Sequence, residues 1–394
     1  MKQVLFVIDS LQSGGAEKSL ISLLSLLDFS KFKVDLLLFS NKGLYLPLLP
    51  KEVRVLESPA FLSRQSRGVK HLLLTRRFKE LFVRLGASAA LRNPWRSRRL
   101  HRAQVTWRWF SMSIDPLPDH YDVAIAYSQG MPTYFVAEKV TANRKLTWLN
   151  TDYRMAKYNK DFDRKYYNKF HRVVTVSDAG KEIFTREFPE LIESTDVVYD
   201  IVSPKLVQAM AQEGASYADD FDGCKILTIG RLVPLKGYDM AIEACRMLKE
   251  DGLKIRWYVI GEGELRKDLE ARVKQYDLTE NFVFLGTFQN PYSFLNRADI
   301  YVQPSRFEGF GLAIAEARIL RRPIVSTNFP AAYGQIRDGE TGLIVNMNAR
   351  DLYLGIKKII ENQELRQRIS ANLKHDKVGT EGELQKVYSL MESC

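Results

Sequence analysis

Two glutamates eight residues apart, Glu308 and Glu316, are the side chains whose spacing best fits chemistry at a helix end. Small and apolar residues separate them; glycine lets a ligand approach the backbone closely, and the first amides of a helix donate to anions. If the whole segment were helical, the carboxylates would stand about 12 Å apart on nearly the same face. This span fits a nucleotide sugar, with Glu308 at the sugar, the diphosphate at the amides and Glu316 at the ribose. The intervening residues that we expect at this ligand are Gly309, Phe310, Gly311 and Leu312.

A cationic loop lies earlier in the chain. Arg231 and Lys236 follow a predicted strand at 226–229 and precede a predicted helix. Both side chains can pair with an anion held at the end of that strand. Taken alone, they are equally compatible with solvated loop charges.

A turn containing two glycines follows the next predicted strand, at 255–260. A backbone without Cβ atoms at Gly261 and Gly263, on either side of Glu262, would let a nucleotide lie close. Such a glycine pair alone is more often a plain turn. An apolar edge that includes Leu285 is expected to flank the base. Because these features occur in order and each at a strand end, together they favour a nucleotide-sugar site.

Buried-strand patterns alternate with polar helical stretches along the chain, which is typical of parallel sheets covered by helices on both faces. The alternation breaks between about 203 and 223, where Ala, Asp, Gly and Ser replace large apolar residues. We therefore expect an α/β protein of two doubly wound domains with a cleft between them, and ligands outside the carboxyl ends of the strands. The expected domains are 1–205 and 206–378, and the C-terminal segment 379–394 is expected to pack back on the first domain.

The motifs within residues 226–346 resemble the donor domain of retaining glycosyltransferases of family 4, and the likeness extends more loosely over the whole chain. The matching motifs are Gly230-Arg231 with Lys236-Gly237, Gly261-Glu262-Gly263, and the pair Glu308 and Glu316. The resemblance implies the GT-B fold, in which two Rossmann-like domains face each other. In that family, the positions of Arg231 and Lys236 bind the donor diphosphate. The first Glu contacts the transferred sugar, and the second hydrogen-bonds the nucleotide ribose.

The first domain carries a partial match. Gly14 and Gly15 resemble the family's glycine loop, which closes over the donor from the other side. Asn150 follows a predicted strand where many relatives carry a histidine that faces the reacting sugar. An asparagine amide can hydrogen-bond a sugar hydroxyl, but it cannot transfer a proton. Asp152 has two interpretations, a polar role at the acceptor or a cap of the following helix.

The mechanism that the resemblance implies needs little help from a base. The leaving diphosphate can accept the acceptor's proton on the same face, and Arg231, Lys236 and helix amides would stabilise its charge without a metal ion or other cofactor. No acidic pair of the Asp-x-Asp kind is placed to hold a divalent cation. The residues expected to take part in catalysis are Glu308, Arg231, Lys236 and Asn150.

All the excess positive charge lies in an insert at residues 61–118. These residues include 13 Lys or Arg and two acids, a net charge of +11 that equals that of the whole chain. Residues 68–86 have a helical period, with large apolar side chains on an arc of about 100°. Basic residues beside aromatic ones suit an anionic membrane surface. The residues that we expect at this surface are Arg76, Arg77, Phe78, Phe82, Arg84, Trp95, Arg98, Arg99, Trp107 and Trp109.

Two other interpretations of this insert stay open. An amphipathic helix packed on its own domain with a solvated basic face is common, and charge alone also fits nucleic acid. No recognisable nucleic-acid module accompanies the insert, so we favour the membrane surface. Family members with such an insert often act on lipid-linked sugars at the cytoplasmic leaflet.

Composition sets the broad class. The chain has 394 residues, 45% of them apolar, which is enough for two full cores. The first apolar run is too short for a signal peptide, and no later run reaches the roughly 18 apolar residues of a membrane span. Three cysteines are too few and too irregularly spaced for a disulfide framework or a zinc site. We expect a cytoplasmic protein, peripheral at the inner face of the plasma membrane.

The sequence therefore predicts a retaining transferase that moves a hexosyl unit from a UDP-sugar to a polyprenyl-diphosphate-linked glycan, in bacterial capsule or exopolysaccharide synthesis. An oxidoreductase fits the strand pattern but not the loops, since Arg266 stands where a dinucleotide fingerprint needs its third glycine. A non-catalytic nucleotide-sugar-binding protein, bound to a membrane or to nucleic acid, stays an alternative. An enzyme with a protein or soluble acceptor is another.

Overall fold

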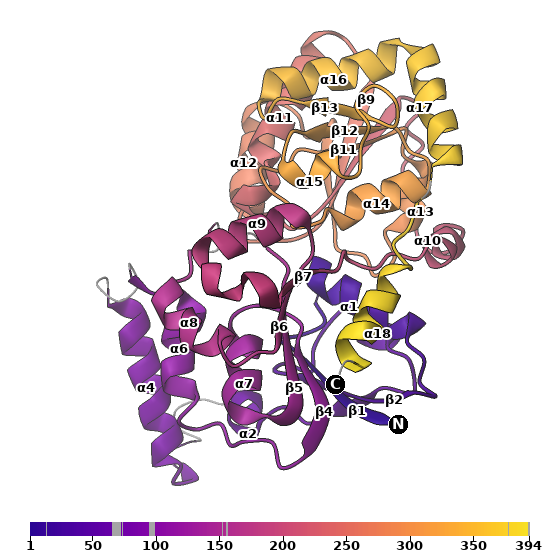
Figure 1. Cartoon of the computed structure of the whole chain (residues 1–394). Coiled ribbons are helices and arrows are strands. Elements are labelled where there is room, and N and C mark those ends of the chain that lie inside the picture. Colours follow the sequence, from indigo (N-terminus) through magenta and orange to yellow (C-terminus); the bar gives the residue numbers. More distant parts are fainter. Residues whose placement is uncertain are drawn as a thin grey trace. The chain divides into compact units, whose positions relative to one another are not determined.

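The computed structural model describes the chain except residues 13, 65–71, 73, 94–98, 152, 155–156, 377 and 393–394. It divides the chain into two compact units (Figure 1). The first unit contains Met1–Tyr199 together with the C-terminal segment from Gly382, and the second contains Asp200–Glu381. The divisions thus fall after residues 199 and 381, whereas the sequence pattern placed them after 205 and 378.

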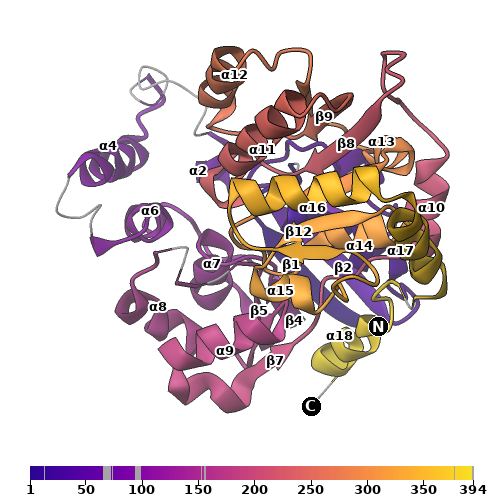
Figure 2. The same ribbon diagram turned by 90° about the horizontal axis from the view of Figure 1, so that it is seen from above.

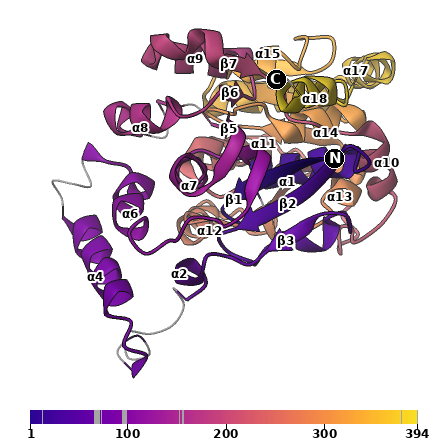
Figure 3. The same ribbon diagram turned by 60° about the horizontal axis from the view of Figure 1, so that its bottom comes forward.

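The first unit is built on a parallel sheet of seven strands in the order β3-β2-β1-β4-β5-β6-β7. Figure 3 shows β3, β2 and β1 side by side. The segment 4–8 is buried without alternation, as expected where helices cover both faces of a parallel sheet. The strands are β1 (Lys2–Ile8), β2 (Phe32–Leu38), β3 (Arg54–Leu56), β4 (His120–Ala126), β5 (Thr141–Leu149), β6 (Arg172–Thr175) and β7 (Thr195–Val197).

The C-terminal helix α18 (Glu383–Glu392) packs within the first unit. Lys2 Nζ donates to the carbonyl oxygen of Met391 at 3.2 Å, and the backbone N–H of Asp28 donates to the Tyr388 hydroxyl at 2.9 Å. The described helices that precede it in this unit are α1 (Gly15–Leu26), η1 (Leu46–Leu48), α2 (Ala60–Ser63), α4 (Phe78–Arg92), α6 (Arg102–Phe110), α7 (Met131–Lys139), α8 (Lys160–Tyr167), α9 (Asp178–Glu187) and η2 (Pro189–Ser194).

The second unit is built on a parallel sheet of six strands in the order β10-β9-β8-β11-β12-β13. Its strands are β8 (Cys224–Ile229), β9 (Ile255–Ile260), β10 (Phe282–Gly286), β11 (Ile300–Gln303), β12 (Ile324–Thr327) and β13 (Leu343–Val345). Its described helices are α10 (Pro204–Ala211), η3 (Pro234–Lys236), α11 (Tyr238–Glu250), α12 (Arg266–Gln275), α13 (Tyr292–Arg297), α14 (Leu312–Ile319), α15 (Pro330–Tyr333), α16 (Ala349–Glu361) and α17 (Gln363–His375).

Helix α16 illustrates how local sequence forms this second core. Asn348 caps the helix, since its side chain accepts from the Asp351 N–H at 2.8 Å. Leu352, Ile356 and Ile359 recur on one face at helical spacing and are fully buried. Figure 2 shows α16 beside α11, and the two helices are in contact. The predicted α/β class with two doubly wound parallel sheets is therefore confirmed.

Both sheets have the strand order of Rossmann-like folds, which locates their ligand edges. The chain order reverses next to the first strand of each sheet, between β1 and β4 in the first unit and between β8 and β11 in the second. In open α/β sheets, ligands bind outside the carboxyl ends of the strands at such a switch point. The loops that follow β8 and β11 are therefore the first place to search for a site in the second unit.

In the described part of the basic insert, helices α4 and α6 lie side by side in Figures 1 and 2 and are in contact. α4 begins at Phe78, later than the predicted helix at 68–86. Its buried face consists of Glu80, Val83, Ala87 and Ala90. The large apolar side chains Phe78, Phe82 and Leu85 remain 62%, 64% and 56% exposed. Among the described residues, no helix has both the length and the apolarity to cross a membrane.

The prediction that places Trp107 at a membrane surface is wrong. Its side chain is fully buried, and its Nε1 donates to Glu138 Oε2 at 3.1 Å. An indole in the core needs such a partner for its N–H. Trp107 is one of three buried residues of α6, with Gln104 and Val105.

The other residues expected at the membrane surface differ in exposure. Arg76 and Arg99 are exposed, and Arg77 pairs with Glu80 at 2.9 Å. Arg84 is partly buried and donates to the carbonyl oxygen of Arg64. Trp109 is also partly buried, and its ring meets that of Phe82 edge-on with centroids 5.7 Å apart. Trp95 and Arg98 lie outside the described residues.

Candidate active site

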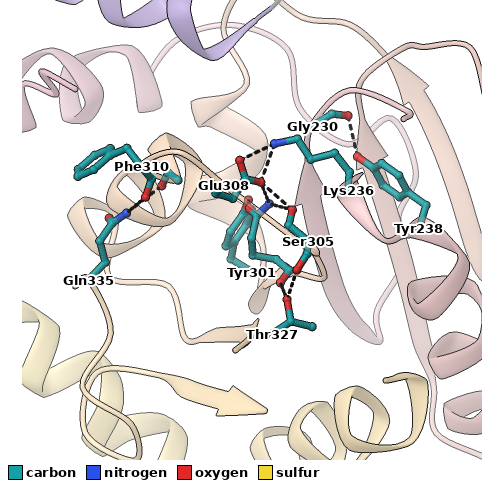
Figure 4. A network of polar contacts seen from close by, with 11 residues as sticks. Gly230, Lys236, Tyr238, Tyr301, Ser305, Glu308, Phe310, Thr327 and Gln335 are labelled. Carbon is teal, nitrogen blue, oxygen red and sulfur yellow. Dashed lines mark hydrogen bonds and ion pairs between the residues drawn. The ribbon is translucent and has the colours of Figure 1, made fainter. Parts of the chain in front are cut away.

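An ion pair occupies the switch point of the second sheet. Lys236 Nζ, in the loop after β8, lies 2.6 Å from Glu308 Oε1 and 2.7 Å from Oε2, in the loop after β11 (Figure 4). The two side chains are 20% and 12% exposed. The structure thus brings together two residues that the sequence separates by 72 positions, at the edge where a parallel sheet binds its ligands.

Close backbone packing brings the two loops together. Gly237 ends the short helix η3 in the left-handed region, with φ of +65°. A Cβ atom at this position would lie 2.0 Å from the carbonyl oxygen of Pro304. Only glycine therefore permits both this conformation and the close approach to the loop after β11. The result is that Lys236, one residue earlier, reaches Glu308.

Residues at and just after the end of β11 donate hydrogen bonds to the Glu308 carboxylate. Gln303 Nε2 and Ser305 Oγ donate to Glu308 Oε1 at 2.7 and 2.6 Å. Tyr238, behind the pair, donates from its hydroxyl to the carbonyl oxygen of Gly230 at 2.6 Å. Burial and the Glu308 carboxylate raise the pKa of Tyr238 well above its ordinary value, so this hydroxyl stays protonated.

Glu308 and Glu316 do not lie on one continuous helix, so the separation of about 12 Å calculated for such a helix does not hold. α14 begins at Leu312, after Gly311 adopts φ of +91° as its N-cap. Glu308 therefore lies in the loop before the helix, and helical geometry does not set the direction of its side chain. Gln335 Nε2 donates to the carbonyl oxygens of Phe310 and Gly311 and fixes the turn.

Glu316 lies inside the unit on α14. It is 1% exposed, and its Oε1 accepts from the Tyr292 hydroxyl at 3.1 Å. The predicted hydrogen bond from Glu316 to a ribose therefore stays a prediction. Leu312 and Gly309, also expected at the donor, are partly exposed at the start of α14 and in the preceding loop.

Close backbone packing, which the sequence did not indicate, requires glycine at two positions after β9. A Cβ atom on Gly261 would lie 1.9 Å from the carbonyl oxygen of Gly230, and one on Gly263 would lie 2.4 Å from that of Leu232. The two loops after β8 and β9 are therefore packed directly against each other. The missing side chains make room for protein backbone, and a nucleotide contact at these glycines stays a prediction.

The other residues that the sequence placed at the donor are Arg231, Glu262 and Leu285, in or next to the loops after β8 and β9. Arg231 is exposed and forms no ion pair with any residue that the structure describes. Glu262 pairs with Arg266 at 2.7 Å, and Leu285 is partly buried on β10. Arg231 is thus a guanidinium available to an anion at the same sheet edge as Lys236.

A second polar cluster lies at the switch point of the first sheet. Asp9 directly follows β1, and Ser128 Oγ, after β4, donates to its Oδ2 at 3.5 Å. Asn150 follows β5; its Nδ2 donates to the carbonyl oxygen of Tyr127 at 2.8 Å, and its N–H donates to Gln129 Oε1 at 3.0 Å. Its Oδ1 is buried and makes no hydrogen bond within the described part of the chain.

Asn150 can therefore accept a hydrogen bond through Oδ1, while one of the two N–H groups of its side chain already donates to Tyr127.

Gly14 is the N-cap of α1 and Gly15 is its first residue, so the glycine loop precedes a helix. Asp152 lies outside the described residues. No group of three His, Cys, Asp or Glu side chains within those residues is arranged to hold a metal ion.

Sequence reasoning missed Gln303, Ser305, Asp9 and Ser128. Each had a weak signal, since each lies at or just after the carboxyl end of a strand next to a switch point. Ordinary polar residues at strand ends are common, however, and only the strand order shows which ends meet.

Comparisons with known proteins show what the second unit and the chain are similar to. Residues 217–376 match the family model described as glycosyl transferases group 1. The N-acetylgalactosamine-N,N'-diacetylbacillosaminyl-diphospho-undecaprenol 4-alpha-N-acetylgalactosaminyltransferase of Campylobacter jejuni is 25% identical over 371 residues, 93% of this chain and 92% of that protein. The capsular polysaccharide biosynthesis glycosyltransferase CapM of Staphylococcus aureus is 31% identical over 147 residues, which cover 36% of this chain and 38% of CapM.

Solved structures agree on the fold of the whole chain. The crystal structure of Anabaena Alr3699/HepE in complex with UDP-glucose matches with a TM-score of 0.72 and 18% identity, over 100% of both chains. At this identity the likeness establishes the architecture alone. The chain therefore has the GT-B fold, and its residues 217–376 match the model of the group 1 glycosyl transferases.

Proposed function

We propose that this protein is a retaining glycosyltransferase that moves a hexosyl unit from a UDP-sugar to a polyprenyl-diphosphate-linked glycan in bacterial surface polysaccharide synthesis. The observation that carries the proposal is the Lys236–Glu308 pair at the switch point of the second sheet, with Arg231 at the same edge. The Campylobacter relative, which aligns over nearly its whole length, is named for an undecaprenol-diphosphate-linked acceptor, and this name supports the acceptor class.

The proposed chemistry uses the charges of this edge. The acceptor hydroxyl attacks the anomeric carbon on the face that the diphosphate leaves, the bond from that carbon to the diphosphate breaks, and a diphosphate oxygen takes the hydroxyl proton. Lys236, Arg231 and the first amides of α14 stabilise the charge that develops on the leaving group. Glu308 contacts the transferred sugar. The reaction uses no metal ion, which stays a prediction.

A panel of UDP- and GDP-sugars tests the proposal. The protein is incubated with UDP-glucose, UDP-galactose, UDP-N-acetylglucosamine, UDP-N-acetylgalactosamine and GDP-mannose, each with and without a polyprenyl-diphosphate-linked glycan. We expect one UDP-sugar to add one hexosyl mass to the lipid-linked glycan, and NMR to show an α-linkage from an α-donor. Parallel incubations replace the lipid-linked glycan with a protein or a soluble glycan, and turnover only in these would favour that alternative. Binding of a UDP-sugar without any transfer would favour a non-catalytic protein.

We further propose that the insert docks this protein on an anionic membrane surface. The exposed side chains Phe78, Phe82 and Leu85 form an apolar ridge on α4, within a segment that carries the whole net charge of +11. A helix with an exposed apolar face and basic neighbours binds at the headgroup level through apolar burial and attraction to anionic lipid. A solvated basic face would explain the charge but not three large apolar side chains more than half exposed.

Vesicle sedimentation tests the docking. We expect the protein to sediment with vesicles containing anionic lipid at low salt, and we expect the double variant Phe78→Ser/Phe82→Ser to lose most of this binding. Leu354→Ser is the matched control, because Leu354 is a large apolar residue 48% exposed on α16 of the second unit. Equal binding by the ridge variant and the wild type contradicts the proposal, as does preferential capture by duplex DNA.

A further inference from the structure

Glu308 Oε1 has an unusual number of hydrogen-bond donors. Gln303 Nε2 lies 2.7 Å away, Ser305 Oγ 2.6 Å and Lys236 Nζ 2.6 Å. A carboxylate offers about four lone-pair positions, about two on each oxygen, so three donors leave Oε1 no room for another. The other oxygen, Oε2, receives Lys236 Nζ at 2.7 Å. The carboxylate is therefore held asymmetrically, with Oε2 as the oxygen that retains room for another donor.

The groups that hold Oε1 are themselves fixed. Gln303 is 2% exposed and Ser305 is fully buried. The Tyr301 hydroxyl donates to Gln303 Oε1, and Gln303 Nε2 also donates to Ser305 Oγ at 2.7 Å. The amide of Gln303 thus uses its oxygen and both N–H groups, and the Ser305 hydroxyl accepts once and donates once. Such a closed network has one arrangement of donors.

Neighbouring strands fix the backbone beneath these side chains. β11 pairs with β8 on one side and with β12 on the other. From β12, the Thr327 hydroxyl donates to the carbonyl oxygen of Gln303 at 3.2 Å and to that of Ser305 (Figure 4). Tyr301 is fully buried, and burial raises its pKa well above the ordinary value, so its hydroxyl remains a donor.

We propose that Gln303 and Ser305 are positioning residues that fix the Glu308 carboxylate so that Oε2 faces the transferred sugar. The inference rests on the proposed function, in which Glu308 contacts that sugar. Neither Gln303 nor Ser305 touches the donor. They act by restricting the rotation of the Glu308 side chain. A displacement of about 1 Å at a reacting group can cost about 100-fold in rate.

The proposal separates sugar transfer from nucleotide binding. UDP carries the diphosphate and the ribose but lacks the transferred sugar, so it does not use Glu308 Oε2. Loss of a positioning donor should therefore lower kcat while the affinity for UDP is unchanged. A merely structural role would disturb both, because the loops after β8 and β11 would move together.

The experiment compares Ser305→Ala and Gln303→Met with the control Ser293→Ala. Ser293 is 2% exposed in the same unit, and its hydroxyl donates to the carbonyl oxygen of Ala215, away from Glu308. We measure kcat with the UDP-sugar that proves active in the panel, UDP affinity by calorimetry, and Tm. Ser305→Ala and Gln303→Met are expected to lower kcat about 10- to 100-fold with UDP affinity within about twofold of wild type. Ser293→Ala is expected to keep the wild-type kcat.

Two outcomes overturn the positioning role and leave the proposed function standing. One is a wild-type kcat in both variants. The other is a loss of kcat that is matched by an equal loss of UDP affinity and by a lower Tm, as expected for a damaged loop. If the wild-type protein neither binds UDP nor transfers any sugar, the proposed function itself fails, and the positioning role fails with it.

Discussion

At the residue scale, Lys236 and Glu308 behave as one charged unit. Both side chains are mostly buried, and Nζ contacts both carboxylate oxygens. Removing one partner leaves the other charge partly buried and unpaired, which is costly and lets it adopt a new position. We therefore expect each residue to be needed for the position of the other as well as for its own proposed contact with the donor.

Lys236→Ala and Glu308→Ala should each lower the rate of sugar transfer about 100- to 1000-fold, because each removes a charge that we propose acts on the transition state. Circular dichroism and Tm should show that the fold persists. Lys249→Ala is the control, since Lys249 forms an exposed ion pair with Asp277 in the same unit. Near-normal turnover by either site variant would contradict the assignment.

Combining Lys236→Ala with Glu308→Ala should cost little more than the worse single substitution. Groups that act as one unit give strongly non-additive losses, because the first substitution already disables the second group. Values of kcat/KM for the wild type, the two single variants and the double variant form the cycle. Losses that multiply would mean that the two residues act independently.

The sequence predicted the charged residues of this site but not how they are held. Arg231, Lys236 and Glu308 belong to a motif, and their chemistry follows from residue type. Gln303 and Ser305 are ordinary polar residues in the printed sequence. Their role depends on the pairing of β11 with β8 and β12, which composition and periodicity do not specify.

At the element scale, the insert shows which part of a helical pattern can be predicted. The period of 68–86 indicated a helix with an apolar arc, and α4 has that arc exposed. The period could not show which face packs on the unit. The small residues of α4 decide this, because they let α6 approach: a Cβ atom on Gly86 would lie 2.2 Å from the Trp109 ring.

Gly86→Ala should destabilise the protein, although Gly→Ala inside a helix ordinarily stabilises by about 1 kcal/mol. The added methyl group collides with Trp109, and overpacking of this kind costs about 1–3 kcal/mol. In a Trp109→Ala background the collision is gone, so the same substitution should stabilise. Urea unfolding of the wild type, the two single variants and the double variant measures the sign in each background. A stabilising Gly86→Ala in the wild-type background would refute the close packing of α4 on α6.

At the scale of the whole molecule, each unit completes its own core, and the first does so with the end of the chain. Val387, Leu390 and Met391 of α18 are buried in that unit, 0–9% exposed. A compositional break at 203–223 predicted the passage into the second unit. The return after residue 381 has no such break, yet the expected boundary after 378 lies three residues from it, whereas the expected boundary after 205 lies six residues from the observed one after 199.

Met391→Ala should cost about 2–5 kcal/mol, as expected for a fully buried side chain that leaves a cavity. Hydrogen exchange read by mass spectrometry should show faster exchange in peptides of the first unit only. Leu373→Ala, at a buried position of α17 in the second unit, is the reciprocal control. Faster exchange confined to the second unit in Met391→Ala would contradict the membership of α18 in the first.

The central claim is that the edge formed by Lys236, Glu308 and Arg231 transfers a sugar from UDP to a lipid-linked glycan. The most direct measurement is the mass of the lipid-linked product after incubation with each UDP-sugar, for the wild type and for Glu308→Ala. We predict that one UDP-sugar adds a single hexosyl mass with the wild type and that Glu308→Ala forms at most about 1% as much product. An unchanged lipid-linked glycan with every UDP-sugar, or equal product from both proteins, would contradict the account.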